Sequence, residues 1–461
     1  MLIVSPHRVC VAMPQVDVLS LRYWAVVASS VLVSGAVAFV PLPSYGALKD
    51  SPKALVDEVW QVVQQEYVDS SFNRLDWLAV RQQLLEQHYT SREHAYSAIQ
   101  GMLQRLNDPY TRFMTPEEFA ILRTQTSGEV SGIGIRLGMD EKTQQLTILE
   151  PLANSPATRA GIEAGDRLLA IDGHSTRRMS IEEASRRIRG RVGTPIELQL
   201  FRPNRGTFRL TLMRALIELP AVRSLVKEEG DQRIGYIYLS EFTSHAADQV
   251  QAAIRQLQAE QVNGFVLDLR GNPGGLLQAG IDIARMWLDQ GMIVRTVDRS
   301  GHSEQARATQ SALTTLPLVV LVDQRSASSS EILTGALQDN GRAIVVGTKT
   351  YGKALVQSIH QLSDGSGLSV TVAHYYTPKG TDINRMGITP NIMVTLPQEV
   401  SRNPRLWATA ADPLYQEAVV QLRQAIYRSQ FVTPVNTAQT SNSEAGADNM
   451  CQVDDPCSPV K

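Results

Sequence analysis

The sequence predicts a multidomain α/β protein with a helical domain near its N-terminus and a mainly-β domain inserted before the α/β core. Three observations lead to this prediction. The chain has 461 residues, which is too long for one ordinary hydrophobic core. Apolar residues at helical spacing fill the stretch up to about residue 125, and strand-like runs replace them up to about residue 215. Beyond that point strand-like and helix-like runs alternate, which is typical of an α/β core.

The first 47 residues have the order of a secretory signal. Arg8 and Arg22 precede an apolar run over residues 24–40, and the small-residue stretch Ser44–Ala47 follows it. The run is long enough to be confused with a membrane span, so an uncleaved anchor is the alternative. In both cases we expect the folded part to be exported, and in the second case it stays associated with the membrane.

Residues 48–125 are predicted to form the helical domain. Leu55, Val59 and Val62 recur at the spacing of a buried helical stripe. Met102 and Leu106 repeat that spacing further on, and a proline soon afterwards ends the helix.

Residues 126–215 are predicted to form the mainly-β domain, in which a turn over 131–135 opens a strand. A helical pattern over 181–188 and an alternating strand over 195–201 follow.

The α/β core is predicted over residues 216–400, followed by a helical segment over 401–431 and a polar tail over 432–461 that we expect to be disordered. The buried strands of the core are expected at 234–239, 265–269, 318–322 and 344–346, and helices at 247–257, 278–288 and, beyond the core, 413–426.

Ser328 and Lys353 are a candidate nucleophile and base, 25 positions apart. Ser328 stands where a buried strand passes into a helix-like run, and Lys353 follows the next strand of the core. A serine hydroxyl needs a neighbour that takes its proton, and a lysine can do so only when burial lowers its pKa. Taken alone, the serine is more typical of a helix cap paired with Glu331, and the lysine of a surface charge.

The wider segment 322–357 resembles the carboxyl-terminal processing peptidases, which are Ser/Lys endopeptidases with a PDZ domain. The resemblance lies in the serine-rich run before the helix and in the Tyr-Gly-Lys that follows the next strand. It implies that Ser328 is the nucleophile, Lys353 the base and Gln357 the group that orients the lysine. It also implies a core similar to the crotonase and Clp protease fold.

The stretch Asp268–Gly275 resembles the D-L-R-x-N-x-G-G motif of this family. This implies that the N–H groups of Gly274 and Ser329 form an oxyanion hole. Glu331 and Asp339 match acidic family positions that support the site, and capping or holding Arg342 or nearby backbone groups is their simplest role. Further motifs of the family are matched at Asn107–Phe113, Asp364–Gly367 and Tyr376–Gly380.

Three residues depart from the family pattern. Ser329 stands where alanine is usual, Tyr351 where phenylalanine is commoner and Ala354 where glycine is usual. Because Ser329 adds a hydroxyl beside the site, the nucleophile could be another serine of the run, but the spacing to Lys353 favours Ser328.

Residues 126–215 resemble a PDZ domain, above all in the stretch Ala160–Gly173. A PDZ domain adds a peptide as a further strand to an exposed sheet edge, and the N–H groups of a Gly-containing loop bind the peptide's carboxylate. Arg189 resembles a family arginine that couples this domain to the core, although a solvated charge at a helix end is equally compatible. The resemblance places the carboxylate-binding loop at Ser131, Gly132, Ile133, Gly134 and Ile135.

The resemblance implies an enzyme that binds protein substrates by their carboxyl termini and needs no metal or organic cofactor. A formal net charge of −2 gives no reason to expect nucleic acid as a partner. The stretches 279–288 and 371–384 resemble the subgroup that processes the D1 precursor of photosystem II, which implies the thylakoid lumen or the periplasm. A general periplasmic tail-specific protease is the alternative within the family.

Two other interpretations stay open. A Ser-His-Asp hydrolase needs an imidazole, and His302, His360 and His374 are available, although none lies in a recognisable motif. A non-catalytic PDZ scaffold belongs to another class of protein, and the presence of both the candidate dyad and the oxyanion glycine argues against it.

Overall fold

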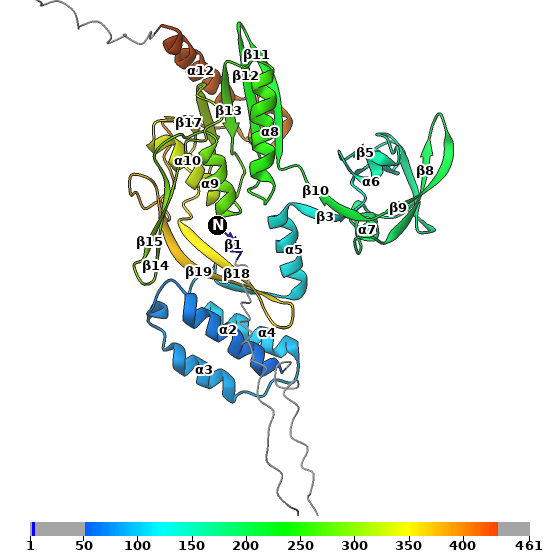
Figure 1. The fold of residues 1–461 in the computed structure, drawn as a ribbon. Coiled ribbons are helices and arrows are strands. Elements are labelled where there is room, and N and C mark those ends of the chain that lie inside the picture. The colour runs from blue at the N-terminus through cyan, green and yellow to red at the C-terminus, as the bar shows by residue number, and fades with distance from the viewer. Residues whose placement is uncertain (1, 5–50, 432–461) are drawn as a thin grey trace, which may run out of the picture.

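The structure is a computed structural model that describes residues 2–4 and 51–431 (Figure 1). Most of the predicted secretory signal and the whole predicted tail over 432–461 lie outside these residues. Within the described part of the chain, no helix is both long enough and apolar enough to cross a bilayer.

A group of helices, blue in Figure 1, forms one end of the molecule. Their bounds are α2 Pro52–Glu66, η1 Phe72–Arg74, α3 Trp77–Glu86 and α4 Arg92–Gln104. Each α-helix begins after a side chain that accepts a hydrogen bond from its first turn, namely Ser51, Asp76 or Ser91. Leu55 and Val59 of the predicted stripe are buried. They belong to the cluster in which Trp60 stacks on Trp77.

A mixed sheet lies against these helices and shares their apolar cluster. Its strands are, in order, β1 Leu2–Val4, β18 Leu355–Gln361, β19 Gly367–Tyr376, β14 Met292–Asp298 and β15 Ser303–Arg307, and β2 Arg112–Met114 also pairs with β19. Helix α4 ends before the proline as expected, but strand β2 corrects the prediction that residues 48–125 form a purely helical domain. The chain cannot continue the helix across Pro109, and Phe113 and Met114 are buried by pairing with β19.

The second large sheet forms the predicted α/β core. Its strands are, in order, β11 Val222–Glu229, β12 Gln232–Leu239, β13 Gly264–Asp268, β16 Leu318–Val322, β17 Ile344–Gly347 and β20 Ile392–Met393. From β12 to β20 neighbouring strands run parallel, so the carboxyl ends of β13, β16 and β17 meet at one edge. Ligands of open α/β sheets bind at this edge.

Helices cover both faces of this sheet, which explains why its central strands are continuous apolar runs. One face packs against α8 Ala246–Ala259, α9 Leu277–Arg285 and α10 Ser329–Asp339. The other face packs against α12 Pro413–Phe431, which follows the short α11 Gln398–Arg402 and η2 Pro404–Leu406. The predicted strands and helices of the core are therefore confirmed, except that α9 ends three residues earlier than expected.

The mainly-β domain stands apart from the rest of the molecule at the end of a two-stranded ribbon (Figure 1). The ribbon consists of β3 Glu129–Gly132 and β10 Ala215–Glu218, and α5 Pro116–Ser127 leads into it. The sheet of the domain has the order β4 Ile135–Met139, β5 Leu146–Pro151, β6 Arg167–Ile171, β8 Pro195–Arg202 and β9 Gly206–Met213, with β7 His174–Ser175 paired to β6. Helices α6 Pro156–Arg159 and α7 Ile181–Ile188 complete it.

Candidate active site

The serine run lies where the loop after β16 passes into α10. Ser328 is the residue before this helix, and its φ of 59° and ψ of −115° are strained for a residue with a side chain. The hydroxyls of Ser326, Ser329 and Ser330 donate to main-chain carbonyl oxygens at 2.8, 3.1 and 3.0 Å. The Ser328 hydroxyl is buried and has no hydrogen-bond partner in the described residues. Of these serines, Ser328 is the one whose hydroxyl is available for chemistry.

Glu331 is fully buried and joins the loop of the serine to the loop of the lysine. One carboxylate oxygen accepts hydrogen bonds from the N–H groups of Ser328 and Lys353, both at 2.9 Å. The other oxygen accepts from the N–H of Gly352 at 2.7 Å and from the hydroxyl of Thr350 at 2.5 Å. Four donors satisfy the buried carboxylate, and charge-assisted bonds of this kind are the strong ones. The supporting role predicted for Glu331 thus has a definite geometry.

Asp339 lies at the other end of α10 and accepts a hydrogen bond from the N–H of Lys379 at 3.0 Å. Among the roles predicted for Asp339, this contact corresponds to holding a nearby backbone group.

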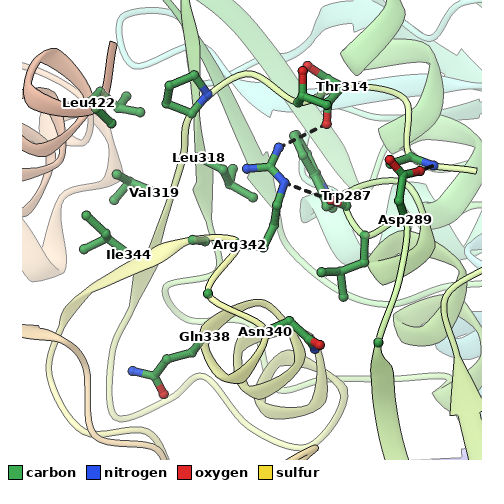
Figure 2. A pocket seen from close by; sticks show the side chains of 18 of the residues that line it. Trp287, Asp289, Thr314, Leu318, Val319, Gln338, Asn340, Arg342, Ile344 and Leu422 are labelled. Carbon is green, nitrogen blue, oxygen red and sulfur yellow. Dashed lines mark hydrogen bonds between the residues drawn. The ribbon is translucent and has the colours of Figure 1, made fainter. Parts of the chain in front are cut away.

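Arg342 does not bond to Asp339 but donates to the carbonyl oxygens of Trp287 and Thr314, and it lines a pocket of about 990 Å³ (Figure 2). This pocket is lined by the residues that begin β16 and β17, at the edge of the sheet opposite to Ser328.

Lys353 follows β17 and is half-buried beside the serine loop. Burial lowers the pKa of its amine. The amine lies 4.4 Å from the ring centre of Tyr110, and the described residues contain no hydrogen bond between the amine and the Ser328 hydroxyl. The hydroxyl of Tyr375 donates to the carbonyl oxygens of Lys353 at 2.6 Å and Ser328 at 3.2 Å, so it holds the two loops side by side. Gln357 is buried on β18, beyond the lysine.

The predicted oxyanion donors both lie next to Ser328. Gly274 has a φ of 102°, and a Cβ there would come within 2.7 Å of the Ala327 carbonyl oxygen and 2.8 Å of the Ser328 Cβ. Only glycine fits this position. Its N–H donates to the side-chain oxygen of Asn272 at 2.9 Å, whereas no acceptor for the N–H of Ser329 is found among the described residues. The N–H of Gly274 is therefore occupied by Asn272, whereas the N–H of Ser329 has no acceptor among the described residues.

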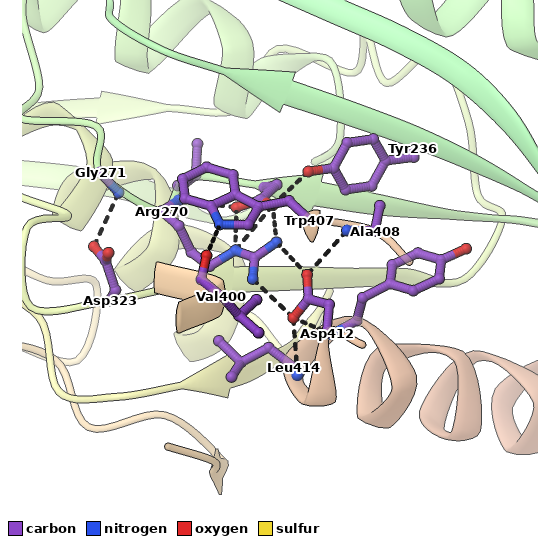
Figure 3. A network of polar contacts seen from close by, with 12 residues as sticks. Tyr236, Arg270, Gly271, Asp323, Val400, Trp407, Ala408, Asp412 and Leu414 are labelled. Carbon is purple, nitrogen blue, oxygen red and sulfur yellow. Dashed lines mark hydrogen bonds and ion pairs between the residues drawn. The ribbon is translucent and has the colours of Figure 1, made fainter. Parts of the chain in front are cut away.

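A buried ion-pair network holds the loop that carries Gly274 (Figure 3). Arg270 has no exposed side-chain surface and pairs with Asp268 at 2.5 Å and with Asp412 at 2.8 Å. The ring of Trp407 covers the guanidinium group at 4.6 Å. Two carboxylates around one guanidinium give the pairing that buried charges need. The segment before α12 is thereby fixed to the end of β13.

The mainly-β domain offers β4 as an edge strand, and α7 packs beside it. Two residues of the predicted carboxylate-binding loop, Ser131 and Gly132, lie instead in β3 and pair with β10. Gly134 has a φ of 78° and Ile133 is fully buried, so the turn into β4 is short. Arg189 is exposed, and no ion pair or hydrogen bond of its side chain to the core is found within the described residues.

Other residues attach the ribbon to the core. His245, the residue before α8, lies 3.0 Å from the carboxylate of Glu129 in β3 and 3.9 Å from that of Glu218 in β10. The hydroxyl of Ser244, near the start of α8, donates to the carbonyl oxygen of Ser127 at the end of α5 at 2.6 Å. The sequence did not single out these residues, because they belong to no motif. His245 and Glu129, for example, are 116 positions apart in the chain.

The histidines of the alternative mechanism have other surroundings. His360 lies 2.8 Å from Glu66, and His302 is exposed, 3.9 Å from Glu304. His374 lies in β19. None of them bonds to the Ser328 hydroxyl, which has no partner in the part of the chain that the structure describes. In the same residues there is no group of three or more His, Cys, Asp or Glu side chains that could hold a metal ion.

Residues 233–394 match the family model of peptidase family S41, and residues 147–202 match that of the PDZ domain. The chain therefore combines a peptidase of this class with a PDZ domain, and the predicted fold is confirmed.

Comparison with related proteins narrows the class of peptidase further. The chain is 44% identical to the carboxyl-terminal-processing protease of Picosynechococcus sp. over 86% of this chain and 97% of that protein. It is 42% identical to the protease of the same name from Synechocystis sp., over 91% of this chain and 99% of that one. A solved structure of a photosystem II D1 C-terminal processing protease is 35% identical, with a TM-score of 0.51 over 79% of this chain and 99% of that chain. The chain belongs to the family of carboxyl-terminal-processing proteases, as its sequence motifs predicted.

Proposed function

We propose that this protease works by a Ser/Lys dyad in which Ser328 attacks the scissile carbonyl and Lys353 accepts its proton. The observation that carries the proposal is the bridge made by Glu331, which bonds to the N–H groups of both residues at 2.9 Å. Burial lowers the pKa of the Lys353 amine, as a general base near neutral pH requires. The Ser328 hydroxyl, which has no hydrogen-bond partner among the described residues, is the proton donor that this base needs.

The remaining groups fit an acyl-transfer reaction. The N–H of Ser329 and, once it leaves the Asn272 side chain, the N–H of Gly274 stabilise the oxyanion of the tetrahedral intermediate. The ammonium group of Lys353 then gives its proton to the departing amine, and an acyl-enzyme remains on Ser328. Water activated by the same lysine releases the acid product. Gln357 orients the lysine amine.

The substrates are proposed to be exported proteins that the enzyme recognises by their carboxyl termini. The free edge of β4 beside α7 supports this, because it can receive a peptide as an added strand whose end reaches the turn at Ile133–Ile135. We propose the D1 precursor of photosystem II as the substrate and the thylakoid lumen or periplasm as the location. The cyanobacterial and chloroplast relatives and the similarity to a D1-processing protease support this choice.

Cleavage of a peptide with a free carboxyl terminus by the purified wild type and four variants tests the dyad. We expect Ser328→Ala and Lys353→Ala to lose turnover by at least about 10³-fold, since each removes a member of a catalytic unit. Lys379→Ala removes an exposed lysine near α10 and should keep wild-type turnover. Full activity of Lys353→Ala, together with loss in a His374→Ala protein, would transfer the role of base to the histidine. Equal inactivity of the wild type and the Ser328→Ala protein would favour the scaffold.

A second experiment tests the substrate. Mass spectra of carboxyl-terminal peptides of exported proteins are compared between cells with and without the enzyme. Accumulation of extended D1 alone supports the proposal, whereas accumulation of many extended proteins would show a general tail-specific protease.

A further inference from the structure

The family motif at Asn107–Phe113 has no part in the mechanism above, yet it reaches the active site. Its Tyr110 places an aromatic ring 4.4 Å from the Lys353 amine, well within the distance at which a ring attracts a cation. Tyr110 also lines one pocket together with Tyr351, the residue two positions before the lysine. A residue from the helical end of the molecule thus contacts the candidate base directly.

The ring is held in place by a rigid frame. The N–H of Tyr110 donates to the Asp108 carboxylate at 2.9 Å, and the hydroxyl of Thr111 donates to the same carboxylate at 2.7 Å. The carbonyl oxygen of Tyr110 accepts from the Ser369 hydroxyl at 3.0 Å, and the Thr111 hydroxyl accepts from the N–H of Thr371 at 3.0 Å. The backbone of Tyr110 and the side chain of Thr111 are therefore tied to β19, which fixes the point from which the ring extends toward the lysine.

The other charges around the lysine act in opposite directions. Asp108 from the same motif and Glu331 from α10 favour the charged amine, whereas Arg112 from β2 and burial disfavour it. The ring attracts the ammonium form and has no such attraction for a neutral amine. The Ser328 hydroxyl, which has no partner in the described residues, offers its proton only to the neutral amine.

We propose that Tyr110 is a positioning residue whose ring holds the Lys353 ammonium group in the free enzyme, so that the lysine reaches Ser328 only after it has lost its proton. The ammonium group gives that proton to water, and the neutral amine leaves the ring and accepts a hydrogen bond from Ser328. The inference rests on the proposed Ser/Lys mechanism. It assigns to the Asn107–Phe113 motif the task of setting the pH at which the base becomes active.

The test compares two rings of the same shape. Tyr110 is replaced by phenylalanine in one protein and by pentafluorophenylalanine in the other, because fluorination removes the negative face of the ring and leaves its size almost unchanged. The readout is the rate at which a fluorophosphonate labels Ser328, measured from pH 5 to pH 10; the serine oxygen bonds to phosphorus and fluoride leaves. The label needs no PDZ docking, and thermal unfolding confirms that both proteins are folded.

We expect the midpoint of the pH–rate profile to be about 0.4–1.5 pH units lower in the fluorinated protein than in Tyr110→Phe. Below both midpoints, the fluorinated protein should be labelled about 2- to 30-fold faster. Equal midpoints, or a higher midpoint in the fluorinated protein, would overturn the inference and leave the Tyr110 ring with a packing role only. A Lys353→Ala protein that is labelled at the wild-type rate would instead refute the dyad itself, so the two failures are distinguishable.

Discussion

Replacing Glu331 by glutamine tests whether one buried carboxylate holds the serine and lysine loops together. Each native oxygen accepts two hydrogen bonds, one pair from the N–H groups of Ser328 and Lys353 and the other from Gly352 and Thr350. A carboxamide keeps one oxygen and gains an NH₂ group, which can only donate. The best orientation turns the NH₂ group toward the Thr350 hydroxyl. The N–H of Gly352 then faces another donor and loses its partner.

The magnitude follows from this loss. A hydrogen bond to a charged group contributes roughly 1.5–3 kcal/mol, and the Gly352 bond disappears completely. The bonds to the remaining donors change from a charged to a neutral acceptor, which weakens each by about half. Removal of a buried charge offsets part of this cost. We therefore expect Glu331→Gln to lower the free energy of unfolding by roughly 3–5 kcal/mol. Turnover should fall by at least about 10-fold, because the positions of both Ser328 and Lys353 depend on the bridge.

The assay is urea unfolding followed by tryptophan fluorescence, together with steady-state cleavage of a peptide substrate. Asp339→Asn is the matched control, because it makes the same chemical change at the other end of α10. There the carboxylate is half-buried and its charged partner, Lys379, is 68% exposed, so we expect a change below about 1 kcal/mol. If Glu331→Gln unfolds and turns over like Asp339→Asn, the bridge does not organise the site.

Three further substitutions test other parts of the site. Gly274→Ala places a Cβ 2.7 Å from the Ala327 carbonyl oxygen at a φ of 102°, so peptide cleavage should fall by at least about 10²-fold; wild-type turnover would show that the loop is free to move. Asp412→Asn removes one of the two carboxylates around the buried Arg270, which stays paired with Asp268, and should cost about 1.5–3 kcal/mol; an unchanged urea midpoint would contradict this. Lys353→Met removes an amine whose pKa burial lowers, so the folded protein holds this proton less tightly than the unfolded chain does. Below its folded-state pKa, the native lysine therefore lowers the stability of the protein, and this cost vanishes as the pH rises to the unfolded-state pKa of 10.5. The melting temperature of Lys353→Met should exceed that of the wild type at neutral pH, and the difference should shrink in alkaline buffer.

Local patterns predicted the elements that carry the site. The apolar run that forms β16 was predicted to the residue, because a parallel strand buried on both faces has no polar position to obscure its bounds. The end of α9 was predicted less well. Trp287 and Leu288 are buried after the helix has ended, so their apolar side chains continue the helical pattern while their backbone does not. Burial determines which side chains are apolar, but a helix and the turn that follows it can both bury the same side chains.

Contacts between distant polar residues could not be predicted in this way. Arg270 and Asp412 are 142 positions apart, and each is also a normal residue of its own loop. Their pairing follows from α12 packing across the face of the core sheet, which no periodicity of either segment indicates. The serine and lysine were recognised because the segment around them resembles a family motif, and the parallel pairing of β16 with β17 explains why their loops lie side by side.

The candidate site lies where the two large sheets meet, so a residue from outside the serine run, such as Tyr110, can contact the proposed base. Ser328 is placed by the core sheet, since it follows β16, whereas Lys353 stands between β17 of that sheet and β18 of the other. Tyr110 precedes β2, which reaches the second sheet by pairing with β19. The ring and the lysine are therefore positioned by strands on either side of β19. If the proposed role of Tyr110 is right, a change in the pairing of β2 would move the ring relative to the lysine and shift the pH–rate profile, although it touches neither member of the proposed dyad.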